Sequence, residues 1–160
     1  MKKGIFLDRD GIVNVERGEY TWRIVDFKLT VGLIDFIREV HEKGYLVIII
    51  SNQGGVGKGL YSMNDVEIVH KYLIDRLAEN NLVFTDIYYC PHHPDIGRCL
   101  CRKPEPVLLE KAIARYNIDA DKSYFIGDSQ RDVDAGEKVN VHTIKVNPNS
   151  DLRDILTLIN

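Results

Sequence analysis

Short apolar runs alternate with amphipathic segments along the whole chain, and this alternation limits the fold more than any other feature of the sequence. The run 45–50 (YLVIII) is apolar throughout, as expected for a strand covered on both faces. Five strands are predicted, at 5–8, 45–50, 86–90, 123–127 and 141–146. Five helices are predicted, at 32–43, 64–80, 106–116, 131–139 and 152–159. Strands that alternate with helices predict an α/β fold with a parallel sheet.

Length and charge narrow the class of protein. A chain of 160 residues is expected to form a single domain, 1–160. Its net charge of −3 is unlike the basic surface of a nucleic-acid-binding protein. The longest apolar run, 46–50, is far shorter than the ~20 residues of a membrane-spanning helix, and no signal peptide is evident. We therefore expect a cytoplasmic protein without nucleic-acid or membrane partners.

Polar side chains stand where the first four predicted strands end. These positions are Asp8, Ser51, Cys90 and Asp128. Because the carboxyl ends of parallel strands meet at one edge of a sheet, we expect these side chains to converge there, where such sheets bind ligands. Asp8 is followed closely by Asp10, and two neighbouring carboxylates require a cation or a proton to relieve their repulsion. The sequence therefore predicts a metal site at this edge.

Each of these features has an ordinary structural explanation when it is considered alone. The sequence Asp-x-Asp-Gly at 8–11 also suits a turn, and Ser51 also suits the cap of a following segment. Lys103 is of a residue type that is usually exposed, and Asp128 with Asp132 also suits the start of a helix. Their common occurrence in this order, at the ends of strands, instead indicates a site for phosphoryl transfer.

In this combination the chain resembles the haloacid-dehalogenase superfamily of phosphohydrolases over nearly its whole length. The matching positions are 8–13, Ser51, Lys103 and Gly127-Asp128 with Asp132. Ile12 departs from the Thr or Val that is usual there, but it is apolar and similar in size. The resemblance implies a three-layer, Rossmann-like α/β fold with a mainly parallel sheet, a zinc-binding loop and no large cap domain.

The resemblance also implies a role for each matching side chain. Asp8 attacks phosphorus and forms an aspartyl-phosphate, and Asp10 protonates the leaving oxygen and then activates water. Mg²⁺ is bound by the Asp8 carboxylate, the Asp10 backbone carbonyl and Asp128. Ser51 and Lys103 hold the remaining phosphoryl oxygens. By the same resemblance, the Asp132 carboxylate steadies this network rather than binding the metal.

All three cysteines lie in the loop 90–101. Together with one histidine, they form the donor set of a closed, tetrahedral Zn²⁺ site, Cys90, His92, Cys99 and Cys101. His93 is an alternative to His92, which the resemblance favours. A Cys99–Cys101 disulfide or unliganded thiols are the other interpretations. Because the loop leads directly to Lys103, we hypothesise that zinc holds this lysine against the phosphoryl group.

The zinc loop before Arg102-Lys103-Pro104 resembles one branch of the superfamily, which contains heptose-1,7-bisphosphate phosphatases and histidinol-phosphate phosphatases. By that resemblance the substrate is contacted by Glu16, Arg17, Gly18, Glu19, Asn52, Gln53, Gly54 and Arg102. The guanidinium of Arg102 suits the second, non-reacting phosphate or the sugar hydroxyls. Tyr20 and Trp22 suit either stacking on a sugar or packing within the protein.

Three functions follow from these features. The first is a Mg²⁺-dependent phosphatase that removes the 7-phosphate of a heptose 1,7-bisphosphate, in the biosynthesis of nucleotide-activated heptose. The second is a histidinol-phosphate phosphatase, since Glu16 and Glu19 suit a cationic substrate. The third, a non-catalytic zinc-stabilised binding domain, is disfavoured by the joint presence of Asp8, Asp10 and Lys103. The anomer is left open, and we expect a monomer.

Overall fold

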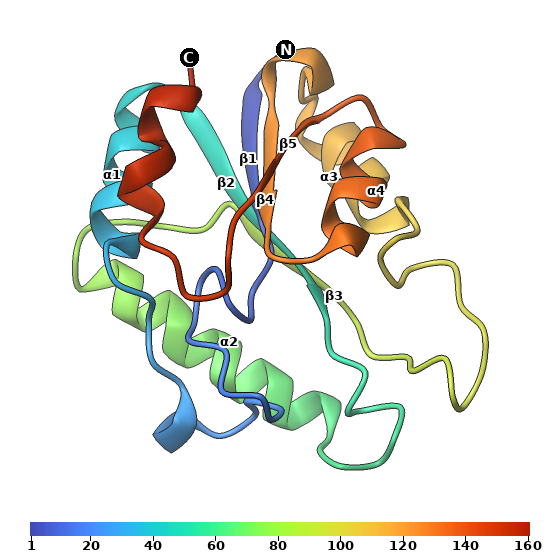
Figure 1. Ribbon diagram of the computed structural model, residues 1–160. Helices are drawn as coiled ribbons and strands as arrows, with labels where there is room; N and C mark the ends of the chain where they lie inside the picture. The colour runs from blue at the N-terminus through green and yellow to red at the C-terminus, as the bar shows by residue number, and fades with distance from the viewer.

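A computed structural model describes residues 1–160 and contains five strands, four α-helices and three short 3₁₀-helices (Figure 1). The strands are β1 Lys3–Leu7, β2 Tyr45–Asn52, β3 Asp86–Cys90, β4 Tyr124–Gly127 and β5 His142–Lys145. The α-helices are α1 Leu33–Glu42, α2 Met63–Ala78, α3 Val107–Tyr116 and α4 Gln130–Glu137. The 3₁₀-helices are η1 Ile24–Asp26, η2 Ala120–Lys122 and η3 Leu152–Leu158. The predicted strands and the first four predicted helices are thus present, with small shifts at their ends.

The five strands form one sheet in the order β3-β2-β1-β4-β5, and every neighbouring pair is parallel. The chain moves outward from β1 through β2 to β3, and then returns to the other side of β1 with β4. The strand order therefore reverses between β1 and β4. Open α/β sheets bind ligands in the crevice at such a switch point. Asp8 and Asp128 directly follow these two strands, so the topology places both carboxylates there.

Helices cover both faces of the sheet, which gives three layers, as predicted (Figure 1). One apolar cluster joins α1, α2 and η3 to side chains of β1 and β2 such as Leu7 and Ile49. The other joins α3 and α4 to side chains such as Phe6 and Ile48. Alternate residues of one strand thus point into opposite layers, which explains why the run 45–50 is apolar throughout.

The last predicted helix, 152–159, is a 3₁₀-helix in the structure rather than an α-helix. The Asp151 side chain accepts a hydrogen bond from the Arg153 backbone N–H at 3.0 Å and begins it. At its end, Lys43 Nζ donates to the backbone carbonyls of Leu156 and Ile159 at 3.3 and 2.6 Å. This tertiary contact from the end of α1 satisfies carbonyls of the tight last turn, which periodicity in the sequence cannot show.

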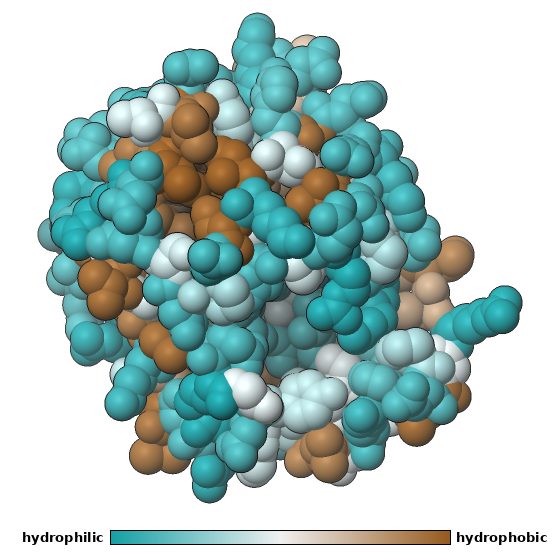
Figure 2. Space-filling view, viewed as in Figure 1, coloured by the Kyte–Doolittle hydropathy of each residue, from teal (hydrophilic) through white to brown (hydrophobic).

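No helix of the chain has both the length and the apolar character needed to cross a membrane. No large cap domain interrupts the α/β core, whose connections at the carboxyl edge are loops. Figure 2 shows that the face in view is hollowed below the strands, and that most residues around the hollow are hydrophilic. Apolar residues gather instead at the upper left, over the region of η3.

Candidate active site

A polar cavity of about 580 Å³ opens at the carboxyl edge of the sheet, within the size range of pockets that bind small molecules. Of the predicted site residues, it is lined by Asp8, Asp10, Glu16, Gly18, Glu19, Asn52, Gly54, Arg102, Lys103 and Asp128. Tyr20 and Asp132 line it as well. His93, which the sequence offered only as an alternative zinc ligand, lines the cavity too, and so do Ser129 and Arg131, to which the sequence gave no role. The structure thus brings residues from both ends of the chain to one cavity.

Lys103 lies at the base of this cavity, and its side chain is only 3% exposed. Its ammonium pairs with Asp8 Oδ1 and with Asp132 Oδ1, both at 2.7 Å, and donates to the Ile50 carbonyl at 2.8 Å. Burial alone would lower the pKa of Lys103, but the two carboxylates outweigh it and raise that pKa. Lys103 therefore remains charged and holds together Asp8, which follows β1, and Asp132 of α4.

Three carboxylates, from Asp8, Asp128 and Asp132, each place an oxygen within 4.8 Å of the other two. Burial raises the pKa of Asp8 to about 7 although Lys103 opposes this shift, and burial also raises the pKa of Asp128. A cation among these oxygens would relieve the electrostatic repulsion between the carboxylates. An oxygen-only donor set of this kind fits Mg²⁺. Asp132 also accepts from Ser129 through Oδ2 and pairs with Lys103 through Oδ1.

Gly11 shows how closely the two strand ends approach one another. Its φ of +89° favours glycine, and a Cβ atom there would lie 2.1 Å from Asp128 Oδ2. The turn after Asp10 therefore packs directly against the Asp128 carboxylate. The glycine of Asp-x-Asp-Gly serves to bring the ends of β1 and β4 together at the candidate metal site.

Asp10 is held by three donors from behind the cavity. Its Oδ1 accepts from Arg9 Nη2 and Asn14 Nδ2, and its Oδ2 accepts from Gln53 Nε2, each at 2.9 Å. Burial would raise the pKa of Asp10, but Arg9 and these hydrogen bonds lower it. The carboxylate is therefore fixed in orientation and favoured in its charged form.

Arg9 is fully buried, which its position between two acids does not reveal in the sequence. It also donates to the Thr21 carbonyl at 2.6 Å, and its Nη1 lies 3.4 Å from His70 Nε2. Burial, together with the charge of Arg9, lowers the pKa of His70 to about 3, so this imidazole is neutral and accepts. Arg9 thus ties the loop after β1 to α2 beneath Asp10.

Three residues that were predicted as catalytic or substrate-contacting do not line the cavity. Ser51 is fully buried, and Gln53, 2% exposed, donates to its hydroxyl at 2.9 Å. Tyr61 in turn donates to Gln53 Oε1 at 2.8 Å, which fixes the amide between Asp10 and Ser51. Arg17 is the third of these residues, and its guanidinium forms an ion pair with Asp26 at 3.2 Å. The ring of Trp22 stacks on Tyr61, so it packs within the protein, whereas Tyr20 reaches the cavity.

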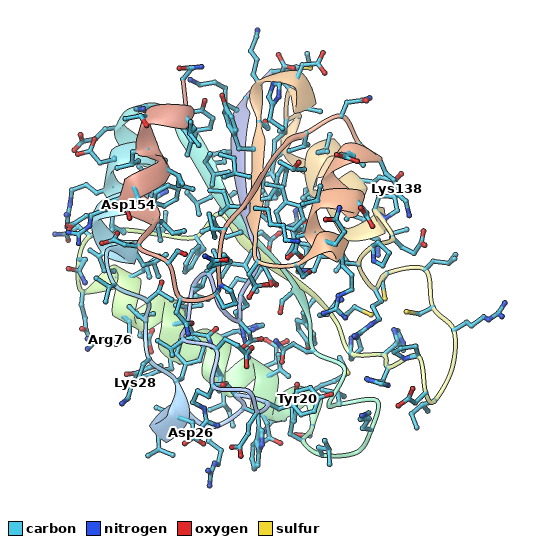
Figure 3. All side chains as sticks on the ribbon, in the orientation of Figure 1. Tyr20, Asp26, Lys28, Arg76, Lys138 and Asp154 are labelled. Atoms are coloured by element: carbon cyan, nitrogen blue, oxygen red, sulfur yellow. The ribbon has the colours of Figure 1, made fainter.

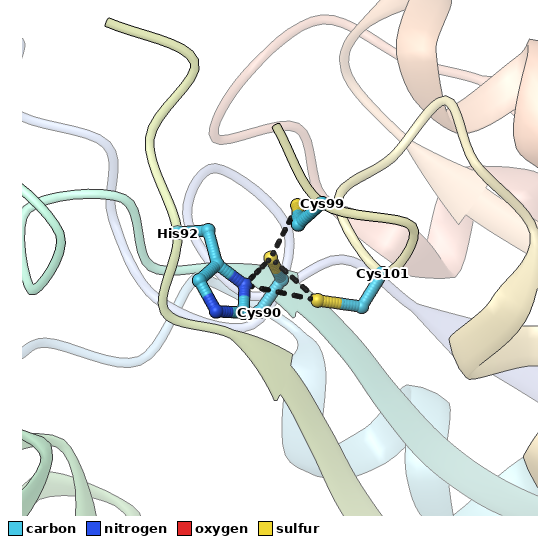
Figure 4. A group of neighbouring side chains, drawn as sticks. All are labelled: Cys90, His92, Cys99 and Cys101. Atoms are coloured by element: carbon cyan, nitrogen blue, oxygen red, sulfur yellow. Dashed lines mark hydrogen bonds between the residues drawn. The ribbon is translucent and has the colours of Figure 1, made fainter. Parts of the chain in front are cut away.

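The four predicted zinc ligands are side by side in the structure (Figure 4). Cys90 Sγ lies 3.0 Å from Cys101 Sγ and 3.7 Å from Cys99 Sγ, and His92 Nδ1 lies 3.2 Å from Cys101 Sγ. All three cysteines are free thiols, and no Cys99–Cys101 disulfide is present. His93 lies outside the cluster, where its Nδ1 accepts from the Asp95 backbone N–H. Three thiols and one imidazole nitrogen fit tetrahedral Zn²⁺.

Hydrogen bonds link this cluster to the cavity. Asn52 clamps the backbone of Lys103, because its Oδ1 accepts from the Lys103 N–H at 3.0 Å and its Nδ2 donates to the Lys103 carbonyl at 3.2 Å. The Gly57 N–H donates to the Pro91 carbonyl at 2.8 Å. A Cβ atom on Gly54 would lie 2.8 Å from Arg102 Nη1. The loop after β2 therefore packs tightly against the segment that follows the zinc loop.

The fold and the site together define a hydrolase of the haloacid-dehalogenase type. In agreement, the family model described as HAD-hydrolase-like matches residues 100–157. The chain is 37% identical over 145 residues to the D-glycero-alpha-D-manno-heptose-1,7-bisphosphate 7-phosphatase of Photorhabdus laumondii, spanning 87% of this chain and 79% of that protein. It is 38% identical over 142 residues to the corresponding beta-heptose enzyme of Haemophilus influenzae, spanning 85% and 76%. The chain belongs to this family of heptose-bisphosphate phosphatases.

Solved structures show the same fold. The D,D-heptose 1,7-bisphosphate phosphatase from B. bronchiseptica, complexed with magnesium and phosphate, superimposes with a TM-score of 0.85 at 29% identity, over 98% of this chain and 86% of that one. A putative HAD-like phosphatase from Mesorhizobium loti gives a TM-score of 0.86 at 26% identity, over 99% and 86%. The relatives with alpha and beta names are equally similar to this chain, so similarity does not decide between the anomers.

Proposed function

We propose that this protein is a Mg²⁺-dependent phosphatase that removes the 7-phosphate of a D-glycero-D-manno-heptose 1,7-bisphosphate, in the biosynthesis of nucleotide-activated heptose. The observation that carries this proposal is the buried Lys103, which pairs with Asp8 at the point where the strand order reverses. A phosphate monoester carries about two negative charges, so a carboxylate nucleophile needs cations around the reacting group. The family relationship to heptose-bisphosphate phosphatases supplies the substrate.

In the first step Asp8 attacks phosphorus. A bond forms between a carboxylate oxygen of Asp8 and phosphorus, and the bond between phosphorus and the sugar oxygen breaks. Asp10 gives its proton to the departing sugar oxygen. The phosphate raises the proton affinity of Asp10 as it arrives, because a second negative charge approaches a carboxylate that is otherwise kept charged by Arg9. The product is an aspartyl-phosphate and the sugar alcohol.

In the second step Asp10, now a carboxylate, takes a proton from water, and the water oxygen attacks phosphorus. The bond between phosphorus and Asp8 breaks, which releases inorganic phosphate and restores the Asp8 carboxylate. Arg9, Asn14 and Gln53 hold Asp10 in position for both transfers. Lys103 offsets charge on the phosphoryl oxygens, and Ser51 supports the site from behind through its bond with Gln53.

We assign the Mg²⁺ site to the carboxylates of Asp8 and Asp128 and to the backbone carbonyl of Asp10. The ion, when bound, neutralises charge on the transferring phosphoryl oxygens. Asp128 is brought to the site by the close packing against Gly11. Asp132 steadies Lys103 through their 2.7 Å ion pair instead of binding the metal.

We assign Zn²⁺ to Cys90, His92, Cys99 and Cys101, with the role of holding the loop that precedes Lys103. Backbone N–H groups of Arg102 and Cys101 lower the pKa of Cys99 against the effect of burial, which favours the thiolate form that metals bind. The need for reduced thiols supports a place in the cytoplasm. We further propose that the chain forms a single domain, 1–160, and acts as a monomer.

Removing zinc is expected to lower both activity and thermal stability. A strong chelator followed by gel filtration and renewed Mg²⁺ should reduce the rate of phosphate release about tenfold or more and lower the Tm by several degrees, because zinc binding contributes to folding. Added Zn²⁺ should restore both values. Unchanged turnover and an unchanged Tm in protein shown to be free of zinc would contradict this role.

Phosphate release from a panel of substrates tests the proposed function. Heptose 1,7-bisphosphate should be hydrolysed with Mg²⁺, and the product should retain its anomeric phosphate. Histidinol phosphate should be hydrolysed far more slowly, because it carries an amine and has no second phosphate. A preference for histidinol phosphate would favour the second function given by the sequence, and release from neither would favour a binding domain. Both anomers should be tested in parallel.

A further inference from the structure

The ion pairs of the arginines single out two side chains in the cavity. The chain has ten arginines, and seven of them pair with a carboxylate within 4.0 Å. The three without such a partner are Arg98, Arg102 and Arg131, and the last two both line the cavity. Lys103, the remaining cation there, is already neutralised by two carboxylates. Arg102 and Arg131 therefore supply the unneutralised positive charge of this cavity.

These two arginines line the same cavity as Lys103 and Asp8. Arg102 directly precedes Lys103, and Arg131 directly precedes Asp132, to which Lys103 is paired at 2.7 Å. Arg102 is partly fixed, because its Nη1 donates to the His92 carbonyl at 3.2 Å. Arg131 is exposed at the start of α4 and makes no hydrogen bond through its side chain. Its guanidinium is therefore free to bind an anion.

The same cavity also carries negative charge outside the reacting centre. Glu16 and Glu19 lie in the loop between β1 and α1, together with Tyr20. In Figure 3 Tyr20 lies low in the view, whereas α4, which ends before Lys138, lies to the upper right. Carboxylates repel a phosphate group but accept hydrogen bonds from hydroxyl groups. The cavity therefore offers guanidinium groups for an anion and carboxylates for the hydroxyl groups of a sugar.

We propose that Arg131 acts with Arg102 to bind the phosphate of the substrate that is not transferred, and so makes the enzyme specific for a bisphosphate. This inference rests on the proposed function. The guanidinium forks of both arginines suit the oxygens of a phosphate group. Glu16 and Glu19, which line the same cavity, are then available to accept hydrogen bonds from the sugar hydroxyls. Because the second phosphate takes no part in the bond changes, Arg131 contributes to binding of the ground state and the transition state alike.

The test compares Arg131→Gln with the unchanged protein on two substrates. These are heptose 1,7-bisphosphate and the heptose 7-phosphate that lacks the anomeric phosphate, both assayed with Mg²⁺. Arg131→Gln should raise KM for the bisphosphate about tenfold with little change in kcat, as expected when a charge-assisted hydrogen bond to a non-reacting group is lost. For the monophosphate both constants should stay within about twofold. Arg131→Lys should restore part of the KM.

Arg115→Gln is the matched control, since it removes the same charge from an exposed side chain of α3 outside the cavity. It should leave both substrates unaffected. An equal effect of Arg131→Gln on the two substrates, or no effect on the bisphosphate, would overturn the inference while leaving the proposed function intact. If the unchanged protein does not hydrolyse the bisphosphate but does hydrolyse other phosphomonoesters, the proposed function fails, and this inference with it.

Discussion

Asp8→Asn is expected to reduce phosphate release from heptose 1,7-bisphosphate by about four orders of magnitude or more, because an amide cannot form the covalent phosphoenzyme. The substitution keeps the shape of the side chain and the neighbouring groups. Since burial raises the pKa of Asp8 to about 7, the charged carboxylate destabilises the folded protein near neutral pH. We therefore expect Asp8→Asn to be at least as stable as the unchanged protein without Mg²⁺, so that lost activity does not reflect unfolding.

Rapid acid quench with substrate labelled in the 7-phosphate checks the covalent step. The unchanged protein should retain label, and Asp8→Asn should retain none. Asp10→Asn serves as the comparison, because it keeps the nucleophile but removes the acid and base. It should form the phosphoenzyme slowly and hydrolyse it more slowly still. Full turnover by Asp8→Asn would show that a different group attacks phosphorus.

Lys103→Met should have the largest effect on stability. The side chain is 3% exposed and separates the carboxylates of Asp8 and Asp132, so its removal leaves buried negative charges without their cation. Breaking a buried ion pair in this way is expected to cost about 3–5 kcal/mol of the free energy of unfolding. Turnover should also fall by about 100-fold or more, because a charge on the phosphoryl oxygens is lost. Urea unfolding without Mg²⁺ measures the first effect.

Lys138→Met is the matched control. This lysine pairs with Glu105 at 3.5 Å and donates to the Pro104 carbonyl at 3.0 Å, but its side chain is 43% exposed. Its loss should therefore cost about 1 kcal/mol or less. Adding Asp8→Asn to Lys103→Met should recover part of the lost stability, because one of the two opposed charges is removed. If Lys103→Met costs no more than Lys138→Met, the buried lysine does not neutralise the acids as described.

Much of the architecture was predictable because it depends on local spacing. Continuous apolar runs such as 45–50 specify strands covered on both faces, and the alternation with helices specifies a parallel sheet. A helix is present where 152–159 was predicted, but it is a 3₁₀-helix, and Lys43, just after α1, donates to the carbonyls at its end. The periodicity of apolar residues shows which face of a segment is buried. It does not show a contact with a residue more than 100 positions away along the chain.

By itself, the sequence determined which chemical groups the site contains. Asp8 and Asp10 follow one strand, and the three cysteines share one loop. Because these residues are close in the sequence, they are close in space whatever path the rest of the chain takes. The tertiary structure decided how those groups are used. It buried Arg9, which donates to Asp10, withdrew Gln53 from the cavity, and brought Arg131 to the same cavity as Lys103. These outcomes depend on crossovers that join residues far apart along the chain, and side-chain spacing does not encode which of them meet.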